Sequence, residues 1–466
     1  MPEKFITRRK ALQAVGAAVM LPDASPASSP GEFEVVHLQP HIRYQQLEGW
    51  GVSLAWWAQV VGAFPEKIRR HYMDLIFNSR RGLGLTVVRY NIGGGENPKY
   101  HFLQHRAAVP GFSPRPGVFN WHADAGQITI LRQAMALGAT RTEAFSNSPP
   151  WYMTQSGSVT GAVGGGDNLR HGAETAFVNY LAAVTDHFRR RWNIRFQTLE
   201  AFNEPVSPWW KFGNYQEGCR IGNKQQNIVI PLLAGAIKSR RLATRIAAPD
   251  DNSIDQTLQS WRSYSARSRE LVYQINTHSY NGTGRPELRN AAAQAGKRLW
   301  MSEYGDGDAT GMRMARRILQ DMRDLRPAAW VYWQAVDSAG GWGFMSNPLD
   351  GNVTEFKIHD KYHVMTGFSR FFRPGCRFIF SSSPDSLAAI DERRRNVAVA
   401  LLNDRHTVKS FTLDCTPLGT GRWQAGIYQF TAGEKPLHHT RIISANRQID
   451  LHLPPQSIYT IQVSRR

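Results

Sequence analysis

The sequence contains little cysteine and none of the residue spacings that bind metals or nucleotides. Its 466 residues include only three cysteines, Cys219, Cys376 and Cys415, so at most one disulfide can form and a disulfide framework is excluded. We expect three free, buried thiols. No group of His, Cys, Asp and Glu has metal-ligand spacing, and the glycine runs at 93–95 and 164–166 match neither a dinucleotide-binding nor a P-loop pattern. We therefore expect neither a metal nor an organic cofactor.

Long hydrophobic runs are also missing. Outside the N-terminus no stretch is long and apolar enough to span a membrane. Residues 1–30 combine the basic run Arg8-Arg9-Lys10 with a short apolar stretch at 11–21 and a following region of small residues. The paired arginines resemble a bacterial twin-arginine export signal. We expect an exported protein, periplasmic or extracellular, without membrane association; a basic start of a cytosolic protein is the alternative.

Acidic residues are outnumbered, and the formal net charge is +19. Such a charge favours polyanionic partners, nucleic acid among them. The basic residues are scattered, however, and neither zinc-finger spacing nor an RNA-recognition signature occurs. We interpret the charge as a solvated surface that mildly favours anions, and we expect no nucleic-acid partner.

Aromatic residues are abundant, with 14 Trp and 15 Tyr, which indicates either a large core or flat rings for stacking on sugars or bases.

Strand-like apolar runs alternate with helical stretches from residue 47 to residue 335. The eight runs are 47–54, 85–90, 140–146, 198–203, 245–249, 272–278, 298–302 and 329–334. Helical periodicity is present at 65–77, 126–137, 173–191, 225–239, 285–295 and 311–325. Repeated strand–helix alternation predicts a parallel sheet, and eight units predict its closure into a (β/α)8 TIM barrel over residues 47–365.

Residues 366–466 have a different character. Helical periodicity fades, and short β-branched or aromatic runs separated by turn residues occur at 377–380, 396–402, 422–429 and 457–463. We expect a small antiparallel β-sandwich domain here. The alternating segment within residues 31–46 lies outside the predicted barrel, and we expect it to join the β-domain as a strand.

Two glutamates follow strand ends of the predicted barrel. Glu204 follows the fourth strand in Asn203-Glu204-Pro205, and Glu303 follows the seventh. Active residues of such barrels stand where strands end, and two carboxylates at one rim are the minimum machinery for glycoside hydrolysis. Each glutamate alone is one acid among 37 acidic residues; the shared strand placement is what favours a catalytic pair.

The motifs around these glutamates resemble glycoside hydrolase family 30, a clan A family. The matching segments, in chain order, are Glu48-Gly49-Trp50-Gly51, Arg89-Tyr90-Asn91-Ile92-Gly93-Gly94, Ser146-Asn147-Ser148-Pro149-Pro150-Trp151, Asn203-Glu204-Pro205 and Ser302-Glu303-Tyr304. The tripeptide at the fourth strand is only moderately specific, whereas the ordered set of five is highly specific. The resemblance covers nearly the whole chain after residue 30 and implies a retaining enzyme with a barrel and a β-domain.

The resemblance also implies roles for single residues. Glu204 would be the acid/base and Glu303 the nucleophile of a double displacement. Asn203 would bind the sugar 2-hydroxyl, with a turn residue as the alternative. Arg89 would lie near Glu303 and hold it ionised through opposite charge, with a structural salt bridge as the alternative. Trp333 would form the floor of the subsite at the cleaved bond, or belong to the barrel core.

For the remaining candidate residues, the sequence leaves two roles open. His278 or Tyr280, at the end of the sixth strand, would hydrogen-bond a catalytic carboxylate, unless His278 is structural. Glu200 has the side-chain parity of Glu204 and points into the barrel, as a partnered buried acid or as a polar ligand of the substrate.

Aromatic residues follow three of the strands: Trp56 and Trp57, Trp209 and Trp210, and Trp151. Neighbouring residues cannot all face inward, so we expect at least one tryptophan of each pair at the rim. Flat rings there would pack on sugar faces.

Residues 49–58 and 198–205 resemble the endo-β-1,6-galactanase branch of the family. The resemblance implies a polysaccharide or oligosaccharide substrate, a plant-type β-galactan of arabinogalactan side chains, and we expect a monomer. β-1,6-Glucanase, xylanase and exo-acting galactosidase or fucosidase activities stay open. A non-catalytic carbohydrate-binding protein is the rival from another class, and the presence of both glutamates argues against it.

Overall fold

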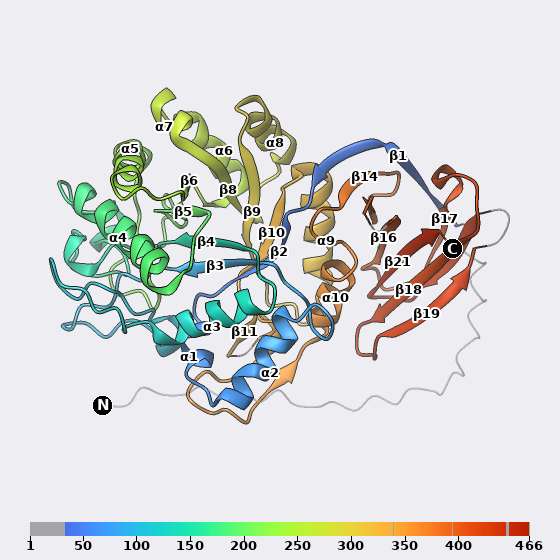
Figure 1. Ribbon diagram of the computed structural model, residues 1–466, viewed down its shortest axis with the longest axis horizontal. Helices are drawn as coiled ribbons and strands as arrows, with labels where there is room; N and C mark the ends of the chain where they lie inside the picture. Colours follow the sequence, from blue (N-terminus) through green and yellow to red (C-terminus); the bar gives the residue numbers. More distant parts are fainter. Residues whose placement is uncertain (1–32, 339, 394, 444–446, 466) are drawn as a thin grey trace, which may run out of the picture. The chain divides into compact units, whose positions relative to one another are not determined.

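The computed structural model describes residues 33–338, 340–393, 395–443 and 447–465. The export pattern expected within residues 1–30 lies outside this part of the chain. Within the described part, no helix has the length and apolar character needed to cross a membrane. A barrel and a second sheet organise it (Figure 1).

Eight parallel strands form a closed barrel. In order around the ring they are β2 (Gly49–Ser53), β3 (Val87–Asn91), β4 (Arg141–Phe145), β5 (Thr198–Glu200), β6 (Arg245–Ala247), β8 (Val272–Asn281), β9 (Arg298–Tyr304) and β10 (Ala329–Tyr332). The ring closes because β10 pairs with β2 and β6 pairs with β8. Each strand overlaps the run from which it is predicted, so the predicted barrel is confirmed.

Helices surround these strands. The six predicted helical stretches correspond to α2 (Glu66–Phe77), α3 (Ala125–Ala136), α4 (Glu174–Trp192), α5 (Asn223–Ser239), α8 (Arg285–Gln294) and α9 (Met312–Gln320). Four further helices have no counterpart in the prediction: α1 (Ala58–Gly62), α6 (Ile254–Ser263), α7 (Ala266–Leu271) and α10 (Asp360–Ser369). Loops also hold the short strands β7 (Asp251–Ser253), β11 (Val336–Asp337), β12 (Met345–Ser346) and β13 (Lys357–Ile358).

The barrel interior is apolar at one end and polar at the other. Val87, Trp300 and Val331 pack together in an apolar layer. Arg89 stands two residues after Val87, so its side chain points to the same side of β3. It is fully buried and in register with Glu143 of β4. The carboxyl ends of the strands thus enclose a polar layer, which includes Arg89, Glu143, Glu200, Asn276 and Ser302.

The second sheet has nine strands. Their order is β19 (Leu437–Ile442), β18 (Trp423–Thr431), β21 (Ser457–Arg465), β16 (Asn396–Asn403), β15 (Ser386–Asp391), β14 (Arg377–Ser381), β1 (Glu34–Gln46), β17 (Lys409–Asp414) and β20 (Gln448–Leu453). The pairs are antiparallel except β1 with β17, which is parallel. The predicted β-domain is thereby confirmed, although four of its strands, β15, β17, β19 and β20, escape the sequence pattern.

Opposite ends of this strand order share one core. Ile427 and Ile461 of β18 and β21 belong to the same buried cluster as Phe411 and Leu451 of β17 and β20. The sheet therefore folds over on itself in the manner of a sandwich.

Figure 1 shows β1 running from the barrel to this domain. The expected boundary at residues 365/366 falls inside α10, and the chain returns to the second sheet after that helix, with β14.

Lys361 of α10 connects three segments at the carboxyl end of the barrel. Its Nζ donates hydrogen bonds to Asp306 Oδ1 (2.9 Å), Tyr332 Oη (2.6 Å) and the carbonyl oxygen of Gly341 (2.7 Å). The side chain is 0% exposed. A buried ammonium group is tolerated when its donors are all bonded, and here these bonds fix the loops after β9 and β11.

We expect Lys361→Met to lower the free energy of unfolding by about 3–5 kcal/mol, because the Asp306 carboxylate would stay buried without its cation. Urea denaturation measures this change. The exposed Lys357 provides the control, since Lys357→Met should leave the free energy of unfolding within about 0.5 kcal/mol of wild type. A loss below about 1 kcal/mol for Lys361→Met would contradict the assigned role.

Candidate active site

Glu204 stands in the turn that follows β5. Its backbone is in the left-handed region, with φ of 48°, and its N–H donates to the carbonyl oxygen of Asp250 (2.8 Å). Such a conformation is strained for a non-glycine residue and is common at functional sites. The carboxylate accepts hydrogen bonds from Asn252 Nδ2 (2.6 Å) at Oε1 and from Trp209 Nε1 (3.1 Å) at Oε2. The side chain is thus held from both sides.

Glu303 lies near the end of β9 and is 4% exposed. Tyr280 Oη donates to its Oε1 (3.0 Å), and Arg89 Nη1 donates to its Oε2 (3.4 Å). Tyr280 ends β8 and Arg89 belongs to β3, so residues from three strands meet at this carboxylate. Arg89 thus lies beside Glu303, and Tyr280 bonds to one of the two glutamates.

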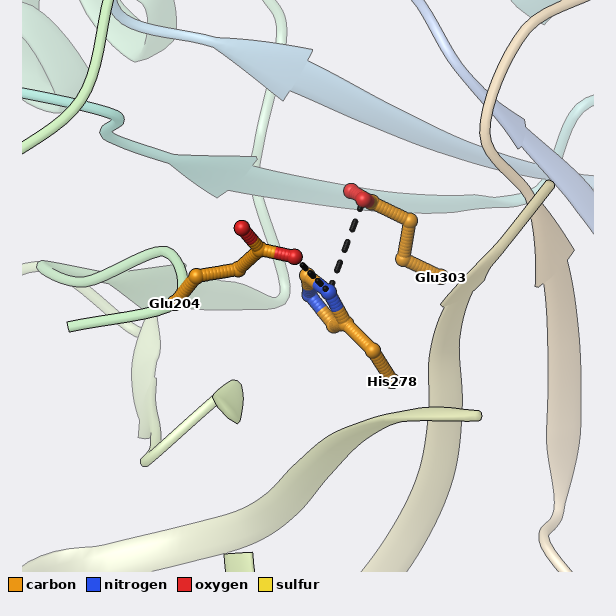
Figure 2. A group of neighbouring side chains, drawn as sticks. All are labelled: Glu204, His278 and Glu303. Carbon is orange, nitrogen blue, oxygen red and sulfur yellow. Dashed lines mark hydrogen bonds and ion pairs between the residues drawn. The ribbon is translucent and has the colours of Figure 1, made fainter. Parts of the chain in front are cut away.

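His278 lies between the two glutamates. Figure 2 shows its ring nitrogen joined to both carboxylates: Nδ1 is 3.2 Å from Glu204 Oε1 and 3.5 Å from Glu303 Oε1. Its Nε2 lies 3.3 Å from Asp250 Oδ1. Burial lowers the pKa of His278, but the carboxylates of Glu303 and Asp250 outweigh this effect and raise that pKa well above its usual value. The neighbouring carboxylates therefore favour the protonated form of His278.

One oxygen of each glutamate and a nitrogen of His278 lie within 4.8 Å of one another, as the ligands of a metal ion would. The same three side chains could therefore hold a metal ion, or keep the contacts of His278 with both carboxylates described above. An approach of one oxygen from each carboxylate to within 4.8 Å agrees better with the ~5–5.5 Å separation of retaining glycosidases than with the ~6.5–9.5 Å of inverting ones.

Arg89 is the centre of the polar layer beneath the pair. It donates to Glu143 Oε1 (2.9 Å), Asp250 Oδ2 (2.6 Å) and the carbonyl oxygen of Ser302 (3.1 Å). Glu200 Oε2 lies 4.0 Å from the same guanidinium. Arg89 therefore contacts the Glu303 carboxylate and also makes structural ion pairs, so the two alternative roles considered for it are compatible.

The buried acids differ in charge state because their neighbours differ. Burial raises the pKa of Asp250, but Arg89 and His278 outweigh it and bring that pKa to about 2. Burial raises the pKa of Glu200 well above its usual value, and Asp250 and Glu143 add to the rise. Burial also raises the pKa of Glu303 to about 7, while His278 and Arg89 act in the opposite direction. The ionisation of Glu303 thus depends on those two cations.

Both glutamates open into a cavity of about 360 Å³. Aromatic rings supply much of its wall, and three of them are well exposed: Trp209 (39%), Tyr215 (50%) and Trp342 (41%). Polar side chains supply the rest; the lining residues besides those named above include Trp56, Arg106, Asn147, Asn203, Trp210, Glu217, Asn252, Gln334 and Asp337. A cavity with flat apolar rings and polar groups between them suits a sugar chain.

The predicted binding residues divide into those at the cavity and those elsewhere. Asn203, Tyr280, Trp56, Trp209, Trp210 and Trp333 line it. Trp57, by contrast, is 0% exposed in the core and donates to the carbonyl oxygen of Ser53. Trp151 is half-buried and lies outside the set of lining residues. Glu200 lies beneath the cavity with Asn276 Nδ2 bonded to its Oε2 (2.5 Å), so it is a partnered buried acid.

Several site residues escape the sequence analysis. Asp250 directly follows the strand predicted at 245–249, and Asn252 comes two residues later, so the strand-end rule used for the glutamates would have found them. Glu143 is a buried charged residue within β4, which is also a usable signal. Arg106 pairs with Asp337 at the cavity wall. These two residues, Glu217 and Trp342 all belong to loops. Sequence periodicity does not predict the course of a loop.

Comparison with known proteins agrees with this geometry. Residues 34–293 match the model of O-glycosyl hydrolase family 30. The endo-β-1,6-galactanase of Hypocrea rufa is 35% identical over 406 residues, which cover 81% of this chain and 83% of that protein. The exo-β-1,6-galactobiohydrolase of Bifidobacterium longum subsp. longum is 25% identical over 418 residues, which cover 65% of this chain and 27% of that protein.

A solved structure shares the fold. The catalytic domain of the GH30 xylanase C from Talaromyces cellulolyticus aligns with a TM-score of 0.72 and 20% identity, covering 92% of this chain and 100% of that one. The five motifs, the barrel with its β-domain, the family match and the galactanase relative agree with one another. The chain belongs to glycoside hydrolase family 30 and is an O-glycosyl hydrolase.

Proposed function

We propose that this protein is a retaining endo-β-1,6-galactanase that acts on the β-1,6-galactan side chains of arabinogalactans. The observation that carries the chemistry is the approach of Glu204 and Glu303 to within 4.8 Å at the floor of an aromatic-lined cavity. The linkage is supported by the 35% identity to an endo-β-1,6-galactanase. Export, as residues 1–30 suggest, and a monomeric state belong to the same proposal.

In the first step Glu303 is the nucleophile. Its carboxylate attacks the anomeric carbon, and the bond from that carbon to the glycosidic oxygen breaks. Glu204 gives its proton to this oxygen, so the leaving sugar departs as a neutral alcohol. Arg89 and His278 favour the ionised form of Glu303 before attack.

In the second step Glu204 acts as a base. It takes a proton from water, whose oxygen attacks the anomeric carbon and releases Glu303 as a carboxylate. Two inversions give net retention.

Asn203 supports both steps: its Oδ1 is buried without a hydrogen-bond partner among the described residues, and it can accept a bond from the sugar 2-hydroxyl. Trp333, 9% exposed, forms the apolar floor beneath the reacting sugar.

Incubation with β-1,6-galactan, β-1,6-glucan and xylan should give short oligosaccharides from the galactan alone. Internal cleavage predicts a mixture of product sizes early in the reaction, which chromatographic sizing resolves. NMR of the first-formed reducing sugar should show the β-anomer, as retention requires. Release of one product size from the outset would instead identify an exo-acting enzyme, and preferred turnover of glucan or xylan would reject the galactan assignment.

The two glutamates should respond differently to the leaving group. We expect Glu204→Gln to lower kcat/KM on galactan about 10²–10⁴-fold, because proton donation is lost. Glycosylation with a dinitrophenyl β-1,6-galactobioside should suffer less, since dinitrophenolate leaves without a proton.

Glu303→Gln should remove turnover of both substrates, because no covalent intermediate forms. The exposed Glu270, paired with Arg267 on the surface, provides the control, and Glu270→Gln should behave as wild type. Near-normal turnover by either catalytic variant would reject its assignment.

Substitution of His278 tests its effect on the nucleophile. His278 lowers the pKa of Glu303, so His278→Gln removes this effect and should raise the pKa above its value of about 7. Glu303 would then be protonated over more of the pH range, and the acidic limb of the kcat/KM profile should move to higher pH. A purely structural histidine would lower kcat/KM at all pH values without moving this limb.

A further inference from the structure

Trp342 is a cavity residue that the proposed mechanism leaves unused. It lies between β11 and β12, lines the cavity with both catalytic glutamates and is 41% exposed. Large exposed apolar side chains are uncommon enough to need a reason when they gather at one place. Trp209 and Tyr215 share this property and the same cavity, so the cavity has an aromatic rim.

The indole of Trp342 has one covered side. A Cβ placed on Gly305 would lie 3.3 Å from the six-membered ring, and one placed on Gly307 would lie 3.3 Å from Nε1. The ring therefore packs along two glycine backbones, at positions where any other residue would push it away. Gly305 comes two residues after Glu303, so this support also places the ring beside the nucleophile. The uncovered part of the ring accounts for the exposure.

The loop that carries Trp342 is held in place. The carbonyl oxygen of Trp342 accepts a hydrogen bond from Tyr332 Oη (2.8 Å), and the carbonyl oxygen of Gly341 accepts one from Lys361 Nζ (2.7 Å). Gly341 has a φ of +74°, and a Cβ there would lie 2.8 Å from Ala309 Cβ. Only glycine suits this position. A ring fixed before the ligand arrives loses little conformational entropy on binding.

The two sides of the cavity face different parts of the substrate. Trp209 donates to Glu204 Oε2, and Glu204 protonates the oxygen of the leaving sugar, so Trp209 belongs to the leaving-group side. Trp342 lies above the glycines that follow Glu303, which attacks the anomeric carbon of the glycone. The wall that carries Trp342 is therefore on the glycone side.

We propose that Trp342 is a glycone-side binding residue, whose open face stacks on the second sugar ring counted from the cleaved bond. This inference rests on the proposed function and adds to it a subsite that favours substrates with at least two galactosyl units before the cleaved bond. The ligand is the apolar C–H face of a pyranose ring. The stacking lowers the free energy of binding without taking part in the chemical steps.

A length series of substrates tests the subsite. We compare p-nitrophenyl β-galactoside, β-1,6-galactobioside and β-1,6-galactotrioside as substrates of wild type and Trp342→Ala. Trp342→Ala should lower kcat/KM about tenfold on the two longer substrates, through KM rather than kcat, and less than about twofold on the monogalactoside. Trp342→Phe should keep at least about a third of the wild-type value, because it retains a flat ring.

The control is Phe119→Ala. Phe119 is an aromatic residue of similar exposure, 37%, outside the set of cavity-lining residues, and its variant should match wild type on all three substrates. An equal loss by Trp342→Ala at every length would overturn the proposal, as would a loss in kcat alone or no loss at all.

Binding measured without turnover provides the second readout. In the Glu303→Gln background, calorimetry should give a Kd for β-1,6-galactotriose about tenfold weaker with Trp342→Ala than without it. Equal Kd values with and without Trp342→Ala would reject the subsite. If Trp342→Ala proves unstable in the kinetic test, Trp342→Leu, which also has no flat ring, is compared in the same way. If wild type cleaves no β-1,6-galactan, the proposed function fails, and the same length series on the glycan that it cleaves tests Trp342 separately.

Discussion

The buried guanidinium of Arg89 is the constraint on which the catalytic end of the barrel depends. It is fully buried and lies over the ring of Phe145 at 4.2 Å from its centroid. A single cation in this position must be neutralised within reach. Glu143, Asp250 and Glu303 bond to it directly, and they come from three different parts of the barrel. The charge therefore fixes the relative positions of these segments.

The charge balance around Arg89 also determines what the catalytic pair can do. Carboxylates raise the pKa of His278 well above its usual value, Arg89 and His278 bring the pKa of Asp250 to about 2, and burial and neighbouring acids raise the pKa of Glu200. Arg89 and His278 also act to lower the pKa of Glu303, so they favour a negative charge on the catalytic pair. A retaining mechanism needs this state, with one glutamate ionised and the other protonated. The polar layer is thus part of the chemistry although it touches no substrate.

The sequence predicts this arrangement to the extent that periodicity determines it. The barrel strands alternate with helical stretches along the chain, so the strand ends, and with them Glu204 and Glu303, can be located. Four strands of the β-domain are missed. Of these, β19 has mostly exposed residues and little hydrophobic contrast, whereas β20 alternates exposed and buried residues and carries a usable signal. Trp56 and Trp57 illustrate the limit within a loop. Trp56 has a φ of 74° and reaches the cavity, whereas Trp57 turns into the core, and no pattern distinguishes them.

The rim of the cavity follows a different principle from its floor. The floor is built from strand ends, where buried charges hold one another. The rim is built from loops, and its aromatic rings are placed by glycines and by buried donors such as Lys361. Arg106 lies over the ring of Trp56 at 5.1 Å and pairs with Asp337, so even the charged groups of the rim are tied to a ring. Because a change in these loops leaves the Arg89 layer intact, substrate choice can vary among relatives while the chemistry stays the same.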